Sequence, residues 1–176
     1  MISHCLNAAV KILRSYCDHG HVLRIDGIQG ESQNDKHKGW VDIESYSWGA
    51  VQSTNLALGS GGGVGKVQYK DLTVTANLDK ATPAISHFLS SGKHIPKVEL
   101  SLCKAGGQQM EYYRITLENA MLTHVMHNAF HNSDSPKISY QFQAEQIKQS
   151  YWEQTTSGGK GAETQSGWNI KQNKAV

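Results

Sequence analysis

The sequence predicts a mainly β fold, a compact barrel or sandwich with one helix laid on a sheet. Three observations lead to this prediction. Apolar and polar residues alternate in several segments after residue 20, turns rich in Gly and Asn separate these segments, and a single later segment has helical start and stop signals. Many strands and one helix in 176 residues fit one domain around one core, without an internal repeat.

The first 20 residues differ from the rest, and we expect an N-terminal extension at residues 1–20 ahead of a β domain at residues 21–176. Apolar residues recur in the extension at helical spacing, with Lys11 and Arg14 among them, which indicates a possible amphipathic helix. A helix of this length is marginally stable alone. Two interpretations stay open: an extension without an essential role, or a helix docked on the domain or on a neighbouring subunit.

The β domain begins with a short strand, a connector and two long strands. His21–Asp26 predicts the short strand, and Gly27–Gly39 predicts a connector because it is rich in turn-forming residues. In Trp40–Gln52 and in Lys66–Leu78 the bulky residues change face midway, which indicates a β-bulge or a strand buried on different sides along its length. Two neighbouring strands with this pattern favour burial within the domain and also against a partner.

One segment after the long strands predicts a helix. Thr82 is a good N-cap, Pro83 suits the first helical position, and Gly92 provides the C-terminal stop. The helix has one apolar stripe that can lie on a sheet, formed by Ile85, Phe88 and Leu89.

The rest of the chain predicts further strands and turns. Residues 97–102 alternate as in a half-buried strand, and the next strand extends to about Val125. Clean alternation in residues 138–145 predicts another strand. Turns are expected at Gly106-Gly107 and at Ser157–Gly161, and the last strand is expected at Gly167–Gln172.

Composition argues against several classes of protein. A formal net charge of +2, with no stripe of Lys and Arg, does not indicate a nucleic-acid partner. Three cysteines leave one unpaired in any intrachain scheme, which fits a reducing compartment. No apolar run approaches the roughly 20 residues of a membrane helix, and the N-terminus lacks the pattern of a signal peptide. We therefore expect no membrane insertion, and export, if it occurs, by another route than general secretion.

Two motifs resemble binding sites but depart from the required spacing. The glycine run at residues 59–66 is similar to a phosphate loop, yet Ser60 replaces the first glycine and Val67 replaces the magnesium-binding hydroxyl. A mobile hairpin arm explains this run better. His124 and His127 project from opposite faces of a strand and His131 lies in the loop beyond, so packed or solvated histidines are favoured over a zinc site.

The candidates for catalysis are weak. Asp42 and Glu44 share one strand face and could act as a glycosidase pair, although an ordinary solvated face explains them equally well. Cys103 has no evident base partner. These residues predict a protein that is not an enzyme and that uses no metal or cofactor.

Eight segments in the same order resemble the Hcp family, the haemolysin-coregulated proteins of bacterial type VI secretion, over about residues 21–173. They are IDGIQGES at 25–32, HKGW at 37–40, SYSWG at 45–49, GSGGGVGKV at 59–67, DKATP at 79–83, SSGKHIPKVEL at 90–100, KAGGQQMEYYRITL at 104–117 and GWNIKQN at 167–173.

This resemblance implies a squat two-sheet β-barrel with one side helix, and a structural role. Family members close into hexameric rings that stack into a hollow tube, which a contractile sheath drives into a neighbouring cell behind a spike protein. The implied partners are therefore further copies of the chain, the spike and sheath proteins, and small effectors inside the ring. The implied route is assembly in the bacterial cytoplasm and export through the type VI system without a signal peptide.

Two sets of residues are candidates for these contacts. The flexible arm at residues 53–65 is expected to bridge stacked rings, and Ser45 and Ser47, small polar residues between aromatic ones, are expected to face the channel. The arm residues concerned are Ser53, Asn55, Leu56, Leu58, Gly61, Gly62, Gly63 and Val64.

The chain departs from the family pattern in its N-terminal extension, which could impede stacking if it packs on a ring face. It also ends shortly after the last matching segment, which argues against an appended toxin domain. Two other functions remain open: a monomeric barrel that binds a small apolar ligand, and, more weakly, a hydrolase that uses Asp42 and Glu44 or Cys103.

Overall fold

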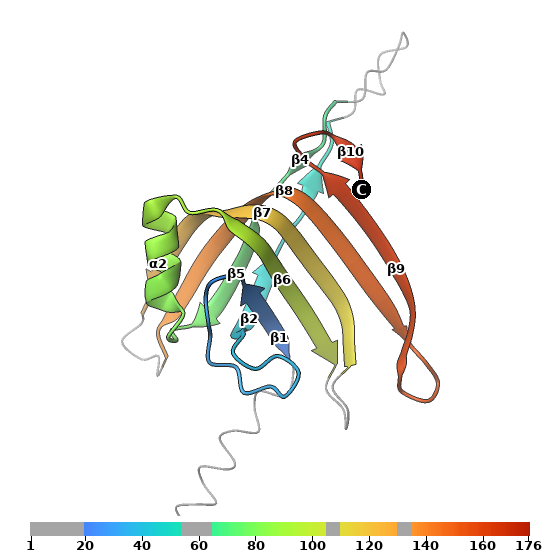
Figure 1. Ribbon diagram of the computed structural model, residues 1–176, viewed down its shortest axis with the longest axis horizontal. Coiled ribbons are helices and arrows are strands. Elements are labelled where there is room, and N and C mark those ends of the chain that lie inside the picture. The colour runs from blue at the N-terminus through green and yellow to red at the C-terminus, as the bar shows by residue number, and fades with distance from the viewer. Residues whose placement is uncertain (1–19, 54–64, 105–109, 130–134) are drawn as a thin grey trace, which may run out of the picture.

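The structure is a computed structural model that describes residues 20–53, 65–104, 110–129 and 135–176. These residues form ten strands and one helix (Figure 1). In chain order the elements are β1 (His21–Ile25), β2 (Val41–Ser47), β3 (Ala50–Val51), β4 (Gln68–Tyr69), β5 (Leu72–Asn77), α2 (Thr82–Ser91), β6 (Ile95–Lys104), β7 (Met110–Asn128), β8 (Lys137–Gln154), β9 (Lys160–Asn169) and β10 (Lys174–Ala175).

Six strands form a closed barrel, which confirms the mainly β prediction. They follow one another in the order β8, β5, β2, β1, β6 and β7, and pairing of β7 with β8 closes the circle. Strands β9 and β10 continue the sheet beyond β8, while β3 and β4 pair separately as a short hairpin. The predicted helix lies on the side of the barrel and packs against β7 (Figure 1).

The long strand β8 belongs to two regions of the sheet. Its first part, from Lys137 to Phe142, pairs with β5, and its last part, from Gln146 to Gln154, pairs with β9. All the pairings in the sheet are antiparallel, so the alternating side chains point into the core on one face and outward on the other. The outer face therefore divides into a region over β2, β5 and β8 and a region over β1, β6, β7 and β9.

The interior of the barrel is filled with side chains. Tyr140 and Phe142 of β8 are completely or almost completely buried and meet edge to face, with ring centroids 5.6 Å apart. Leu23, Val74 and Leu100, from three other strands, are 0% exposed or nearly so and belong to the same cluster. This dense packing leaves the barrel a solid core and not a container.

The predicted change of face in the two long strands has a local cause. A β-bulge between Ile43 and Ser45 turns the rest of β2, so that Tyr46 and Trp48 pack against the same core as Ile43. Trp48 also stacks on Tyr69, with ring centroids 5.8 Å apart. Tyr69 ends β4, and β5 begins at Leu72, so the second predicted long strand is interrupted between these two residues. The domain's own core takes up Tyr46, Trp48 and Tyr69 in part. The expectation that these strands also bury a face against a partner stays a prediction.

The helix begins one residue earlier than expected. Ala81 is the N-cap and Thr82 the first helical residue, so the prediction of a Thr82 cap is wrong. The Thr82 hydroxyl instead accepts a hydrogen bond from the backbone N–H of Asp79. Gly92 ends the helix in the left-handed conformation, with φ of 61°, as predicted.

Strand β6 is buried more completely than its alternation suggests. The expectation of a half-buried strand is wrong, since Glu99 and Ser101, on the outer face, are 6% and 0% exposed. The last predicted strand also differs, because Gly167–Asn169 ends the long strand β9 and a turn precedes β10. The N-terminal extension up to residue 19 and the predicted Gly106-Gly107 turn lie outside the described residues.

Candidate assembly surfaces

An uncharged polar region covers β2, β5 and the first part of β8 on the outer face. The cross-strand registers form two rows across β2, β5 and β8. One row is Ser45, Thr75 and Ser139, and the other is Ser47, Thr73 and Gln141. We call this set of residues the hydroxyl face: Ser45, Ser47, Thr73, Thr75, Ser139 and Gln141. The two sequence-predicted residues, Ser45 and Ser47, are exposed, and the other four are half-buried.

The bulge in β2 is what brings these small residues outward. After the extra residue Glu44, both Ser45 and Ser47 point away from the core that holds Tyr46. Beside Ser47 the surface has a hollow of about 470 Å³, which Trp48, Thr73 and Gln141 help to line. Short hydroxyl and amide side chains offer weak, neutral hydrogen bonding, so the six residues of the hydroxyl face carry no charge themselves. The charged residues Lys70 and Asp71 lie beside them in the lining of the hollow.

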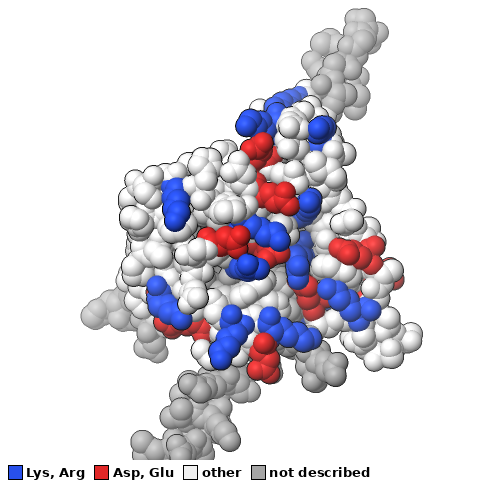
Figure 2. Space-filling view, in the orientation of Figure 1, with Lys and Arg blue, Asp and Glu red and all other residues white. Residues whose placement is uncertain are grey.

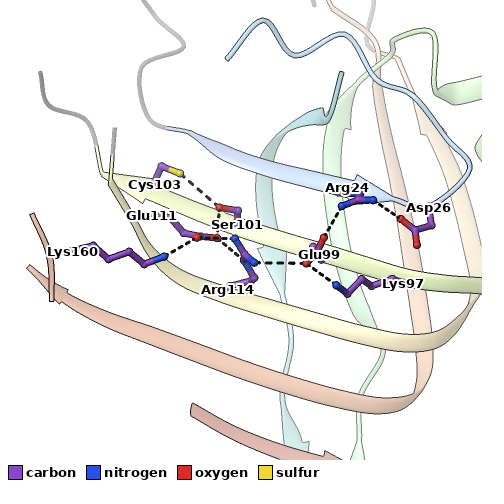
Figure 3. A network of polar contacts seen from close by, with 9 residues as sticks. All are labelled: Arg24, Asp26, Lys97, Glu99, Ser101, Cys103, Glu111, Arg114 and Lys160. Atoms are coloured by element: carbon purple, nitrogen blue, oxygen red, sulfur yellow. Dashed lines mark hydrogen bonds and ion pairs between the residues drawn. The ribbon is translucent and has the colours of Figure 1, made fainter. Parts of the chain in front are cut away.

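The other region of the outer face carries a network of ion pairs (Figure 3). Glu99 of β6 lies at its centre, and its side chain is only 7% exposed. Its carboxylate meets Arg24 at 3.3 Å, Lys97 at 3.2 Å and Arg114 at 3.7 Å. Three cations around one buried carboxylate compensate for the solvation that the carboxylate loses.

A second carboxylate extends the network towards β9. Arg114 donates two hydrogen bonds to Glu111, of 2.6 Å and 2.8 Å, while Ser101 and Lys160 add contacts of 2.8 Å and 3.1 Å. Burial alone would raise the pKa of Glu111, but these donors hold it below its usual value. Burial disfavours the Arg114 cation, yet the hydrogen bonds and charge of Glu111 raise the pKa of Arg114 overall.

These ion pairs join β1, β6, β7 and β9 across the sheet. Figure 2 shows the result as interspersed basic and acidic side chains on the face seen in Figure 1. This network was not predicted from the sequence, although the position of Glu99 between apolar neighbours in β6 was a signal that could have revealed it. A charge in a buried strand needs partners, and the register supplies them from strands distant in sequence.

An apolar pocket of about 430 Å³ opens beside the β3–β4 hairpin. Its floor consists of core residues such as Leu72 and Phe142, and the stacked Trp48 and Tyr69 form part of its wall. Among the described residues, this apolar pocket is the feature that a ligand-binding barrel would use. That alternative is not favoured, because side chains fill the barrel interior.

The candidate catalytic residues Glu44 and Cys103 lie in structural surroundings. Glu44 forms an ion pair with Lys137. Cys103 is buried, and burial raises the pKa of its thiol, which makes it a poor nucleophile. His131 lies outside the described residues, and among the residues that are described no group of His, Cys, Asp and Glu could hold a metal ion. No helix in the described part is long and apolar enough to cross a membrane.

The predicted stacking arm is described only at its base. Ser53 accepts a hydrogen bond of 3.2 Å from the backbone N–H of Gly65, and the Gln52 side chain donates to the Gly65 carbonyl at 3.1 Å. Both ends of the arm are thus fixed to each other. The other predicted arm residues, Asn55, Leu56, Leu58, Gly61, Gly62, Gly63 and Val64, lie outside the described residues.

Comparison with known proteins identifies the family of this chain. The family model described as "Type VI secretion system effector, Hcp" matches residues 22–157. Protein hcp1 of Pseudomonas aeruginosa is 37% identical over 153 residues, which cover 86% of this chain and 94% of that protein.

Solved structures agree with this assignment. A type six secretion system protein superposes with a TM-score of 0.84 at 25% identity, covering 90% of this chain and 99% of the other. Hcp1 from Salmonella typhimurium gives 0.76 at 29% identity with the same coverage. The chain therefore belongs to the Hcp family and is a tube subunit of type VI secretion.

Proposed function

We propose that this tube subunit closes into a hexameric ring whose channel is lined by the hydroxyl face. The rings stack into a hollow tube that holds small effectors and travels with a spike protein inside a contractile sheath. The neutrality of the hydroxyl face carries this proposal. A channel wall of Ser, Thr and Gln side chains allows cargo to pass without strong ionic or apolar contacts.

Ring closure requires a head-to-tail contact between two different surfaces of neighbouring copies. The large exposed apolar residues among those described include Leu78, at the end of the second long strand, together with Met126 and Tyr151. The contact therefore relies on polar surface as well as apolar surface, which is common where each partner also exists alone.

The arm at residues 53–65 is proposed to bridge one ring to the next. The Ser53–Gly65 hydrogen bond supports this idea, because it gives the arm a fixed point of departure from the barrel. Shortening the arm should leave the ring intact and weaken stacking. Unchanged tube formation after that deletion would contradict the assignment. The protein is proposed to assemble in the bacterial cytoplasm and to leave through the type VI system without a signal peptide.

Cysteine labelling tests the lining of the channel. In a chain with Cys5 and Cys17 changed to Ser, we would compare Ser47→Cys on the hydroxyl face with Ser90→Cys on the exposed side of α2. Native mass spectrometry should give a hexamer for both variants. A small maleimide should label both at similar rates, whereas a bulky polymer-linked maleimide should label Ser47→Cys several-fold more slowly.

Two outcomes would contradict the proposal. A monomer mass at high protein concentration would remove the ring itself. Hexamers in which the bulky reagent labels Ser47→Cys as fast as Ser90→Cys would keep the ring but place the hydroxyl face outside the channel.

A further inference from the structure

A third surface cavity lies on the charged region, where the connector, the start of β7 and the β8–β9 turn meet. Its volume is about 420 Å³. Three segments far apart in sequence build it, and we call it the cationic pocket. It is lined by Lys36, His37, Met110, Glu111, Arg114, Gly158, Gly159 and Lys160.

Positive charge exceeds negative charge in this lining. Lys36, Arg114 and Lys160 face a single carboxylate, that of Glu111. Arg114 donates two hydrogen bonds to Glu111. The Lys160 ammonium donates one hydrogen bond to the same carboxylate, out of the three that an ammonium group can donate. The same ammonium lies 3.3 Å from the centroid of the Trp152 ring, which holds it in place by a cation–π contact.

An unpartnered polar side chain also belongs to the pocket wall. His37 is only 6% exposed, and its Nδ1 atom has no hydrogen-bond partner in the described part of the chain. Its ring is fixed edge-on against Trp40, with centroids 4.6 Å apart. A buried imidazole nitrogen without a partner is costly, and a group that supplies charge or a hydrogen bond beside it would lower that cost.

We propose that the cationic pocket binds carboxylate side chains of an acidic peptide segment from a partner protein. The excess of cations over Glu111 selects a negative group, and amine donors suit carboxylate oxygens. The volume exceeds what one carboxylate fills, and Met110 adds an apolar wall, so a stretch of peptide fits better than a lone anion. This activity is separate from ring closure, and it would give the tube a docking point for an acidic protein.

The pocket should also respond to pH through His37. Burial lowers the pKa of His37, Glu111 raises it, and Arg114 and Lys36 lower it, while the Trp40 ring adds no charge. A bound carboxylate would oppose the effect of the two cations and favour the protonated ring. Binding should therefore strengthen as the pH falls, over the range in which the peptide stays ionised.

Calorimetric titration of the full chain with tetraglutamate tests the proposal, with tetraglutamine and inorganic phosphate as comparison probes. Tetraglutamate should bind, tetraglutamine should not, and phosphate should bind more weakly. Lys160→Gln should weaken tetraglutamate binding at least about fivefold, since it removes a charge-assisted donor. Lys171→Gln, which changes an exposed lysine outside the pocket, should alter it less than about twofold.

Several results would overturn the proposal: no tetraglutamate binding, equal losses in the two lysine variants, or phosphate binding as tight as that of tetraglutamate. Binding that does not strengthen as the pH falls from about 6.5 to about 5 would also count against it. If Lys160→Gln fails to fold by circular dichroism, Lys36→Gln provides the same test. The mass of the ring should stay unchanged in either variant, which separates this site from the proposed assembly.

Discussion

Gly30 lies where the connector passes the start of β2 with no room for a side chain. A Cβ atom at this position would lie 2.3 Å from the Trp40 carbonyl oxygen, 2.6 Å from its carbon and 2.8 Å from the Cα of Val41. All three are backbone atoms, so no side-chain rotation can relieve the clash. Gly30→Ala must therefore move the connector away from β2.

That movement has a calculable cost. It strains the hydrogen bonds that join the connector to itself, among them Gly30 N–H to Gly39 O at 2.8 Å and Ser32 N–H to Trp40 O at 2.9 Å. Overpacking typically costs about 1–3 kcal/mol and one weakened hydrogen bond about 1 kcal/mol, so we expect a loss of about 3 kcal/mol. For a chain of this size the melting temperature should fall by about 6–12 °C.

Gly49→Ala is the matched control, because a Cβ at Gly49 would meet nothing within 4 Å. Gly49 is also absent from the glycines with positive φ among the described residues, so the substitution should leave stability unchanged or raise it by up to about 1 kcal/mol. Differential scanning calorimetry of both variants at equal concentration measures the difference. If Gly30→Ala melts within about 1 °C of Gly49→Ala, the connector does not hold the rigid position argued here.

Three further predictions concern the ion-pair network and the helix end. Arg114→Leu leaves two buried carboxylates with fewer partners and should cost about 3–5 kcal/mol in urea unfolding, whereas Arg24→Leu, half exposed, should cost at most about 1 kcal/mol. Because the pKa of Glu111 is lowered on folding, its ionised carboxylate stabilises the fold fully above about pH 4.5, and this stabilisation is lost as the pH falls through the lowered pKa. The parent chain should therefore lose stability more steeply than Glu111→Gln between about pH 5 and pH 3, and parallel curves of stability against pH would contradict this. Gly92→Ala should cost about 1 kcal/mol in thermal unfolding, and Gly92→Asn less, because φ is positive there.

The sequence was sufficient to predict the elements that depend on local chemistry. Alternation located the strands, and the left-handed Gly92 ended the helix where expected. The N-cap was misplaced by one residue because of a turn that propensity alone does not reveal. In this turn the Thr82 hydroxyl accepts from the Asp79 N–H, and the Asp79 carboxylate accepts from the Ala81 N–H. Local rules do not determine which of two neighbouring turn residues starts a helix.

The network of Glu99, Glu111 and Arg114 could not be predicted in the same way. Its members come from strands whose register is set by long-range pairing, such as Ser101 with Arg114. Sequence shows that Glu99 lies on the polar side of an alternating strand, and a solvated face is the simplest interpretation. Only the closed barrel and the covering connector make that side buried, and burial then requires the three cations that the structure brings together.

The bulge in β2 links the stability of the barrel to the proposed channel. Without the bulge, strict alternation through Glu44 from Ile43 would turn Tyr46 and Trp48 outward and Ser45 and Ser47 into the core. The core would lose two aromatic groups, and the outer face would gain them. By taking up one extra residue, the bulge keeps the aromatic groups in the core and the small hydroxyl residues outside. Deleting Glu44 should therefore give a regular strand with the same two faces, so binding of a hydrophobic dye should stay unchanged, and increased dye binding would contradict this account of the bulge.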